Sequence, residues 1–132
     1  MRAEVNKCLE VLSKGGLILY PTDTVWGIGC DATIDSAIKK IFKLKQRSDS
    51  KALISIVSSY DQLKKLTHIT KEISFEKPTT VIYNNVKDIS KLAISSDGTS
   101  AIRIVNDNFC QQLLSRFNKP IISTSANISK ED

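Results

Sequence analysis

Residues 17–31 read LILYPTDTVWGIGCD, and no other stretch says as much about the chain. The first four residues are apolar and predict a short buried strand, which a proline ends. Two threonines, an aspartate, a tryptophan and the glycines Gly27 and Gly29 follow. Because glycine lets the backbone approach a ligand closely, this loop suits a small polar ligand. The alternative is a plain strand-to-loop junction, in which Thr22 and Asp23 hold the turn by hydrogen bonds to the backbone.

Composition narrows the class of protein. The chain has 132 residues, 41% of them hydrophobic, so we expect one domain over residues 1–132. It has no membrane-length apolar run and no signal-peptide pattern, which predicts a soluble, cytoplasmic protein. The odd number of cysteines (Cys8, Cys30 and Cys110) without a CxxC motif predicts reduced, mostly buried thiols. His68 is the only histidine, which argues against a histidine-based zinc site or a Ser-His triad.

Positive charge is concentrated between residues 39 and 51. The formal net charge of +5 makes an anionic partner plausible and no more. Asp49 is the one acid in this segment, against six basic residues: Lys39, Lys40, Lys43, Lys45, Arg47 and Lys51. The first three fit an ordinary solvated helix face. The last three lie where the helical pattern ends and a loop begins, so we consider them candidates for binding an anionic ligand.

Helices alternate with strands along the chain, which predicts an α/β fold with a mostly parallel or mixed sheet. Helical spacing predicts helices near residues 5–12, 33–45, 58–66 and 107–117. Runs of apolar and β-branched residues predict strands at residues 17–20, 52–57, 79–83, 99–105 and 120–124. Ligands of open α/β sheets bind beyond the carboxyl ends of strands. We therefore expect the threonine-rich loop, the basic loop and residues 125–127 to share one crevice.

The helix over residues 33–45 is expected to have a well-defined buried side. That side comprises Ala37, Ile38, Ile41, Phe42 and Leu44. Asp31 or Thr33 can cap its N-terminus, because short polar side chains accept from the free N–H groups there.

Three motifs, in this order, resemble the YrdC-like threonylcarbamoyl-AMP synthase family. They are PTDTVWGIG at residues 21–29, Lys45-x-Arg47 followed by Lys51, and Ser125-x-Asn127. The resemblance implies a YrdC-like twisted mixed sheet, flanked by helices, with a concave basic site. It also implies a nucleotidyltransferase that makes threonylcarbamoyl-AMP and pyrophosphate from L-threonine, bicarbonate and ATP. This product serves the t6A modification of tRNA, so a tRNA threonylcarbamoyltransferase complex would be the downstream partner.

The resemblance also implies roles for individual residues. Threonine would be bound by Thr24, Arg103 and Ser125. ATP would be bound by Arg47, Lys51, Thr99 and Asn127. Lys45 and Arg47 would be the catalytic cations. Independently of the family, Arg103 stands inside an apolar strand, where a guanidinium without a partner is costly.

The chemistry of this reaction suits the residue types present. Attack of a carbamate oxygen on the α-phosphate needs alignment and charge neutralisation more than a proton-transfer residue. Arg and Lys side chains neutralise phosphates, Mg²⁺ bridges them, and an arginine grips a carboxylate with two hydrogen bonds. We expect no metal site made of protein ligands. Trp26 is a packing wall or, alternatively, a stacking platform for adenine.

The chain departs from the family pattern in ways that keep a second function open. Ser48 and Ala52 stand where members usually have proline, and Ile56 stands where some carry histidine. The chain ends at Asp132, where members continue, so we expect a shortened domain with weak or partner-dependent activity. The alternative is a catalytically impaired YrdC-like module that binds RNA or a nucleotide through its basic segment. An aromatic content of 6% argues against an RNA-stacking surface.

Overall fold

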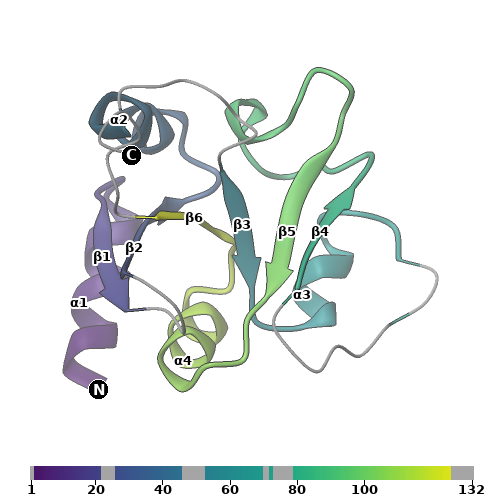
Figure 1. Ribbon diagram of the computed structural model, residues 1–132. Helices are drawn as coiled ribbons and strands as arrows, with labels where there is room; N and C mark the ends of the chain where they lie inside the picture. Colours follow the sequence, from purple (N-terminus) through teal and green to yellow (C-terminus); the bar gives the residue numbers. More distant parts are fainter. Residues whose placement is uncertain (1, 22–25, 46–52, 70–71, 73–78, 126–132) are drawn as a thin grey trace.

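The computed structural model describes residues 2–21, 26–45, 53–69, 72 and 79–125 (Figure 1). In chain order these residues form α1 (Arg2–Ser13), β1 (Ile18–Pro21), β2 (Trp26–Asp31), α2 (Asp35–Lys45), β3 (Ile54–Val57), α3 (Tyr60–Lys64), β4 (Thr80–Tyr83), the 3-10 helix η2 (Lys91–Ala93), β5 (Ser100–Ile104), α4 (Asn108–Phe117) and β6 (Ile121–Ser125). The predicted α/β class is confirmed.

The six strands form one mixed sheet in the order β1-β2-β6-β3-β5-β4. Only β3 and β5 run parallel, and the other neighbours are antiparallel. Of the two sheets that the sequence allows, the mixed one is therefore confirmed and the mostly parallel one is wrong. A hairpin connects β1 to β2, so the chain enters the sheet at an edge.

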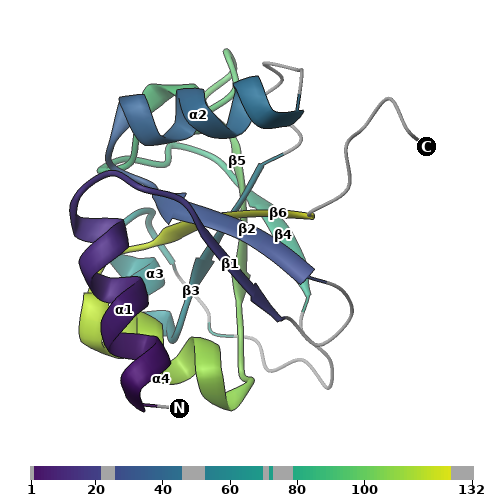
Figure 2. The same ribbon diagram turned by 90° about the vertical axis from the view of Figure 1, so that its left-hand side faces the viewer.

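Helices cover both faces of the sheet, with α2 on one side and α1 and α4 on the other (Figure 2). The core under α1 and α4 includes Leu12, Tyr20, Ile56 and Ile121. The core under α2 includes Ile38, Ile41, Val57, Leu63, Ile102 and Ile122. Strands β3 and β6 contribute neighbouring residues to the two cores, Ile56 and Val57 from β3 and Ile121 and Ile122 from β6, because successive side chains of a strand point to opposite faces.

Capping side chains begin two of the helices. Ser59 accepts a hydrogen bond from the Gln62 N–H at the start of α3. Asp107 accepts from the Cys110 N–H at the start of α4. At the end of α4, Asn118 adopts a left-handed conformation with φ of 59°. Such caps pair backbone groups that helix ends leave free, which explains why α4 begins and ends where it does.

Strand β2 was not predicted from the sequence. It occupies Trp26–Asp31, which we read as loop, and Gly29 lies within it. A Cβ atom on Gly29 would lie 3.0 Å from the Ile122 carbonyl oxygen and 3.0 Å from Tyr20 Cε1. The expectation that Gly29 makes room for a ligand is therefore wrong, because the close approach is to a neighbouring strand and a tyrosine ring.

One residue of the predicted buried side of α2 faces solvent. Leu44 is 48% exposed, whereas Ala37, Ile38 and Ile41 are buried as expected. The buried stripe continues four residues beyond Ile41, at Lys45, and so it passes by Leu44. A lysine thus occupies the next position of the buried stripe.

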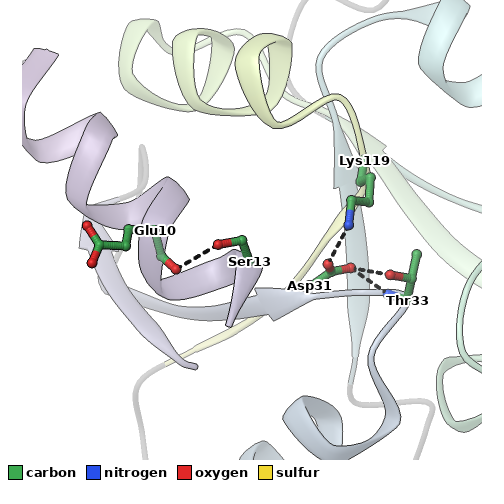
Figure 3. A network of polar contacts seen from close by, with 5 residues as sticks. All are labelled: Glu10, Ser13, Asp31, Thr33 and Lys119. Atoms are coloured by element: carbon green, nitrogen blue, oxygen red, sulfur yellow. Dashed lines mark hydrogen bonds and ion pairs between the residues drawn. The ribbon is translucent and has the colours of Figure 1, made fainter. Parts of the chain in front are cut away.

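Asp31 joins the end of β2 to two other segments (Figure 3). Its carboxylate is fully buried and accepts from the Lys119 ammonium at 3.0 Å. It also accepts from the Thr33 N–H at 2.8 Å and from the Thr33 hydroxyl at 2.6 Å. Asp31 therefore holds the turn before α2, which begins at Asp35. The predicted cap is not confirmed, because the Asp31 carboxylate accepts from Thr33 and not from an N–H of the helix. The same figure shows Ser13 donating to the Glu10 carbonyl in the last turn of α1.

Candidate functional site

The three motif segments attach to one end of the sheet. β1 ends at Pro21, which pairs with Trp26, and Gly27 pairs with Ser125 at the end of β6. Ser123 in turn pairs with Ile54, the first residue of β3. In Figure 2 the end of α2, the end of β1, the start of β2 and the end of β6 lie on the same side. This end combines the carboxyl ends of β1 and β6 with the amino end of β3. The expectation that the motif segments follow the carboxyl ends of strands is therefore met only in part.

Half of the predicted site residues lie outside the described residues. These are Thr24, Arg47, Lys51 and Asn127. The other four, Lys45, Thr99, Arg103 and Ser125, are described and lie in or beside α2, β5 and β6.

Lys45 and Ser125 lie in direct contact. Lys45 is only 5% exposed, and its ammonium donates to the Ser125 carbonyl oxygen at 2.8 Å and to Ser125 Oγ at 3.4 Å. A buried ammonium requires such partners. The last turn of α2 is thus fastened to the last residue of β6, and a positive charge is placed at the end of the sheet that carries the motifs.

Among the described residues, Arg103 has one hydrogen-bond partner, Thr80. Its Nε donates to Thr80 Oγ1 on the adjacent strand β4 at 2.9 Å. Within the described part of the chain, its two terminal nitrogens make no hydrogen bond. The side chain is half-buried on the sheet face that also carries Ile56, with which it is paired. A guanidinium held in this way presents its terminal N–H groups to a carboxylate.

Tyr20 and Ser123 were not predicted as site residues. The Tyr20 hydroxyl donates to Ser123 Oγ, and the phenol is almost completely buried. Burial raises the pKa of Tyr20, whereas the hydrogen bond to Ser123 and the positive charge of Arg103 act to lower it. Arg103 therefore lies within electrostatic range of the phenol. The sequence contained one weak indication of Ser123: residues 123–125 are all polar, although the strand to which they belong begins with apolar residues.

Thr99 lines a pocket. Its hydroxyl donates to Asp97 at 2.6 Å, which stabilises the turn before β5. The pocket has a volume of about 290 Å³ and is lined by Leu53, Ile82, Ser95, Asp97, Thr99, Ser100 and Ala101. Two of these residues, Ile82 and Ala101, are cross-strand partners, so the pocket lies over β4 and the amino end of β5.

Trp26 lies at the same end of the sheet and is 57% exposed. It pairs with Pro21 across the hairpin. The interpretation of Trp26 as a packing wall is wrong in the described part of the chain, because more than half of the side chain is accessible. The stacking interpretation stays a prediction.

The cysteines behave as expected. All three are free, with Cys30 and Cys110 buried. Burial raises the pKa of the Cys30 thiol to about 12, and the nearby Asp31 adds to this effect. Among the described residues, no group of three His, Cys, Asp and Glu side chains could hold a metal ion. None of the described helices is long and apolar enough to cross a membrane.

The fold defines a class: α/β proteins with a mixed sheet, here with a lysine and a serine, Lys45 and Ser125, in contact at one end. Within this class, the chain belongs to the Sua5–YciO–YrdC family, whose model, described as "Telomere recombination", matches residues 10–132. The family resemblance recognised in the sequence is thereby confirmed.

Curated relatives agree on one activity. The chain is 40% identical over 139 residues to the threonylcarbamoyl-AMP synthase of Psychromonas ingrahamii, covering 97% of this chain and 72% of the relative. It is 35% identical over 131 residues to the threonylcarbamoyl-AMP synthase of Saccharophagus degradans, covering 94% of this chain and 69% of the relative. The chain thus spans about 70% of the length of these relatives.

Solved structures share the fold. A complex of P. abyssi Sua5 with L-threonine matches with a TM-score of 0.83 and 26% identity, over 97% of this chain and 40% of that chain. The chain thus spans well under half of the P. abyssi protein. Escherichia coli YciO matches with a TM-score of 0.79 and 23% identity, which supports the fold alone.

Proposed function

We propose that the chain is a threonylcarbamoyl-AMP synthase, which converts L-threonine, bicarbonate and ATP into threonylcarbamoyl-AMP and pyrophosphate for t6A modification of tRNA. The observation that carries this proposal is the 40% identity to a curated threonylcarbamoyl-AMP synthase over 97% of the chain. The threonine complex of P. abyssi Sua5, whose fold this chain shares, supports threonine as a substrate.

Threonine binding is assigned to Arg103, Ser125 and Thr24. Arg103 is the best supported of the three, because Thr80 fixes its Nε and leaves its terminal nitrogens for the carboxylate. A bidentate pair of this kind also orients the amino acid. Orientation matters because the carbamate that forms on the amino group must point at the α-phosphate of ATP.

ATP binding is assigned to Arg47, Lys51, Thr99 and Asn127, with Lys45 and Arg47 as the cations nearest the reacting phosphate. Lys45 contributes a positive charge that its contact with Ser125 keeps at the end of the sheet. The pocket of about 290 Å³ beside Thr99 offers room for part of the nucleotide. Mg²⁺ would arrive with ATP as part of the substrate and would add to the neutralisation of its phosphate charges.

The reaction runs as an in-line displacement at phosphorus. A carbamate oxygen forms a bond to the α-phosphorus while the bond to the bridging oxygen of pyrophosphate breaks. The developing charge lies on phosphate oxygens, which lysine and arginine side chains stabilise. No protein nucleophile is needed.

A direct assay tests the proposal. Purified chain is incubated with ATP, Mg²⁺, L-threonine and ¹⁴C-bicarbonate, with and without a tRNA threonylcarbamoyltransferase complex. We expect pyrophosphate and radiolabelled threonylcarbamoyl-AMP that both depend on threonine. Absence of both products, even with the downstream complex present, would contradict the proposal. The cytoplasmic location and the single domain over residues 1–132 stay predictions.

A non-catalytic RNA-binding module is the second candidate. Lys39 and Lys43 are exposed on α2, so part of the basic segment is accessible. RNA binding through lysines weakens steeply with salt and is indifferent to threonine. A salt titration of tRNA binding, with and without threonine, therefore separates this function from the synthase.

A further inference from the structure

A buried tyrosine reaches across the sheet to the candidate site. Tyr20 is 1% exposed, and its hydroxyl donates to Ser123 Oγ on β6. Gly29 of β2 leaves the space that its ring uses, since a Cβ there would lie 3.0 Å from Tyr20 Cε1. Phe109 of α4 stacks on the ring, with 6.4 Å between the centroids. Because the ring is confined in this way, its hydroxyl has a fixed position.

With the Tyr20 hydroxyl as the donor, the Ser123 proton is left available. Burial raises the pKa of Tyr20, so the phenol stays neutral and keeps its single O–H for Ser123. A serine hydroxyl that accepts one hydrogen bond still has its own proton to donate. Ser123 is half-buried, and within the described residues it makes no second hydrogen bond.

Ser123 and Arg103 share one face of the sheet. Ser123 pairs with Ile54, and Ile54 pairs with Ala101, two residues before Arg103 on β5. Residues two apart on a strand point to the same side, so the serine hydroxyl and the guanidinium lie over the same surface. The positive charge of Arg103 is also felt at the Tyr20 hydroxyl, which agrees with this placement.

We propose that Tyr20 is a positioning residue, which orients the Ser123 hydroxyl as a hydrogen-bond donor toward the amino-acid substrate held by Arg103. This inference rests on the proposed function. Tyr20 itself is buried and acts only through Ser123. A purely structural Tyr20 would fill space between β2 and α4, and phenylalanine would do that equally well.

The first test compares Tyr20→Phe with Tyr83→Phe. Tyr83 is half-buried on β4, and its hydroxyl makes no hydrogen bond within the described part of the chain, so it is a matched control. We expect Tyr20→Phe to raise KM for threonine about three- to tenfold, the effect of losing one oriented hydrogen bond, with KM for ATP within about twofold. We expect Tyr83→Phe to change neither. Equal changes in both KM values, or no difference between the variants, would overturn the inference.

The second test asks whether Tyr20 acts through Ser123. In a double-mutant cycle, Tyr20→Phe combined with Ser123→Ala should bind threonine no more weakly than Ser123→Ala alone. Additive losses would overturn the inference.

A third measurement separates this inference from the proposed function. The threonine-dependent rise in Tm is measured with ATP present, which needs no turnover. A rise that shrinks in Tyr20→Phe supports the inference even if no threonylcarbamoyl-AMP is made. Normal synthesis with an unchanged rise in Tyr20→Phe overturns the inference alone, and no threonine-dependent rise in the wild-type chain overturns it outright.

Discussion

At the scale of single residues, Arg103 shows how one partner prepares a side chain for another. The Thr80 hydroxyl accepts from Nε, which restricts a flexible side chain, and within the described residues the two terminal nitrogens make no hydrogen bond. An arginine in this arrangement loses less rotamer entropy when it grips a carboxylate than a free one would. The strength of threonine binding should therefore depend on the planar guanidinium and not on charge alone.

Replacing Arg103 with lysine tests this. Lysine keeps the charge but cannot form the two parallel hydrogen bonds. We expect Arg103→Lys to lower kcat/KM for threonine about 10- to 100-fold, which corresponds to about 1.4–2.7 kcal/mol. Arg116→Lys, at an exposed position in the last turn of α4, is the control and should change nothing. Steady-state kinetics at varied threonine measure both, and a fully active Arg103→Lys would show that charge alone suffices.

Asp31 is the buried charge on which a second residue-scale prediction rests. Its carboxylate has no solvent exposure and is satisfied by Lys119 and Thr33. Asp31→Asn removes the charge and turns one acceptor into a donor that faces the Lys119 ammonium. We expect a loss of about 2–4 kcal/mol in the free energy of unfolding.

The exposed pair Glu10–Lys14 supplies the control for Asp31. Its side chains are 70% and 73% exposed, and Glu10→Gln should cost at most about 0.5 kcal/mol. Urea unfolding followed by circular dichroism compares the two variants. If Asp31→Asn lowered the free energy of unfolding no more than Glu10→Gln, burial of Asp31 would not strengthen its contacts.

At the scale of elements, β2 is the strand that the sequence did not predict. Its two glycines were read as ligand contacts, because glycine in a polar context is typical of loops. In the sheet, position 29 suits glycine because the Tyr20 ring and the β6 backbone occupy the space that a side chain would fill. No local pattern encodes that, since the partners come from other strands.

The helices were predicted well and the contacts between distant segments were not. Apolar spacing placed α1, α2 and α4 within a few residues, because their periodicity is local. The Lys45–Ser125 contact joins residues 80 apart, and the Tyr20–Ser123 contact joins residues 103 apart. Family resemblance pointed to Lys45, Arg103 and Ser125, but Tyr20 became visible only once β1, β2 and β6 were placed side by side.

Gly29→Ala tests the packing of β2 directly. The new methyl group would lie 3.0 Å from the Ile122 carbonyl oxygen, which belongs to backbone and cannot rotate away. We expect a loss of about 1–3 kcal/mol in the free energy of unfolding, the range for overpacking a core. Urea denaturation measures the loss, and near-ultraviolet circular dichroism should report a changed environment of the aromatic rings. A variant as stable as the wild type would show that β2 and β6 separate at little cost.

At the scale of the whole molecule, the sheet places three motif segments, distant in sequence, at one end. α1 and α4 pack on each other and on the sheet, and they contribute none of the predicted site residues. A ligand that bridges the motif segments should therefore stabilise one end of the molecule more than the helical layer of α1 and α4. Ligand binding stabilises a folded protein by about 2.7 kcal/mol at a ligand concentration 100 times Kd, and the protection appears where local opening is suppressed.

Hydrogen exchange can map that protection. With ATP, Mg²⁺ and threonine together, we expect slower exchange at the end of β1, the start of β2 and the end of β6, and at the C-terminal turn of α2, where Lys45 meets Ser125. Exchange in the first turns of α1 should change little, because Arg2–Ser13 packs beside β1 without contributing a predicted site residue. L-alanine in place of threonine is the control, since its carboxylate can pair with Arg103 but it lacks the hydroxyl. Protection spread evenly over α1 and α4, or equal protection with alanine, would contradict a threonine site at this end of the sheet.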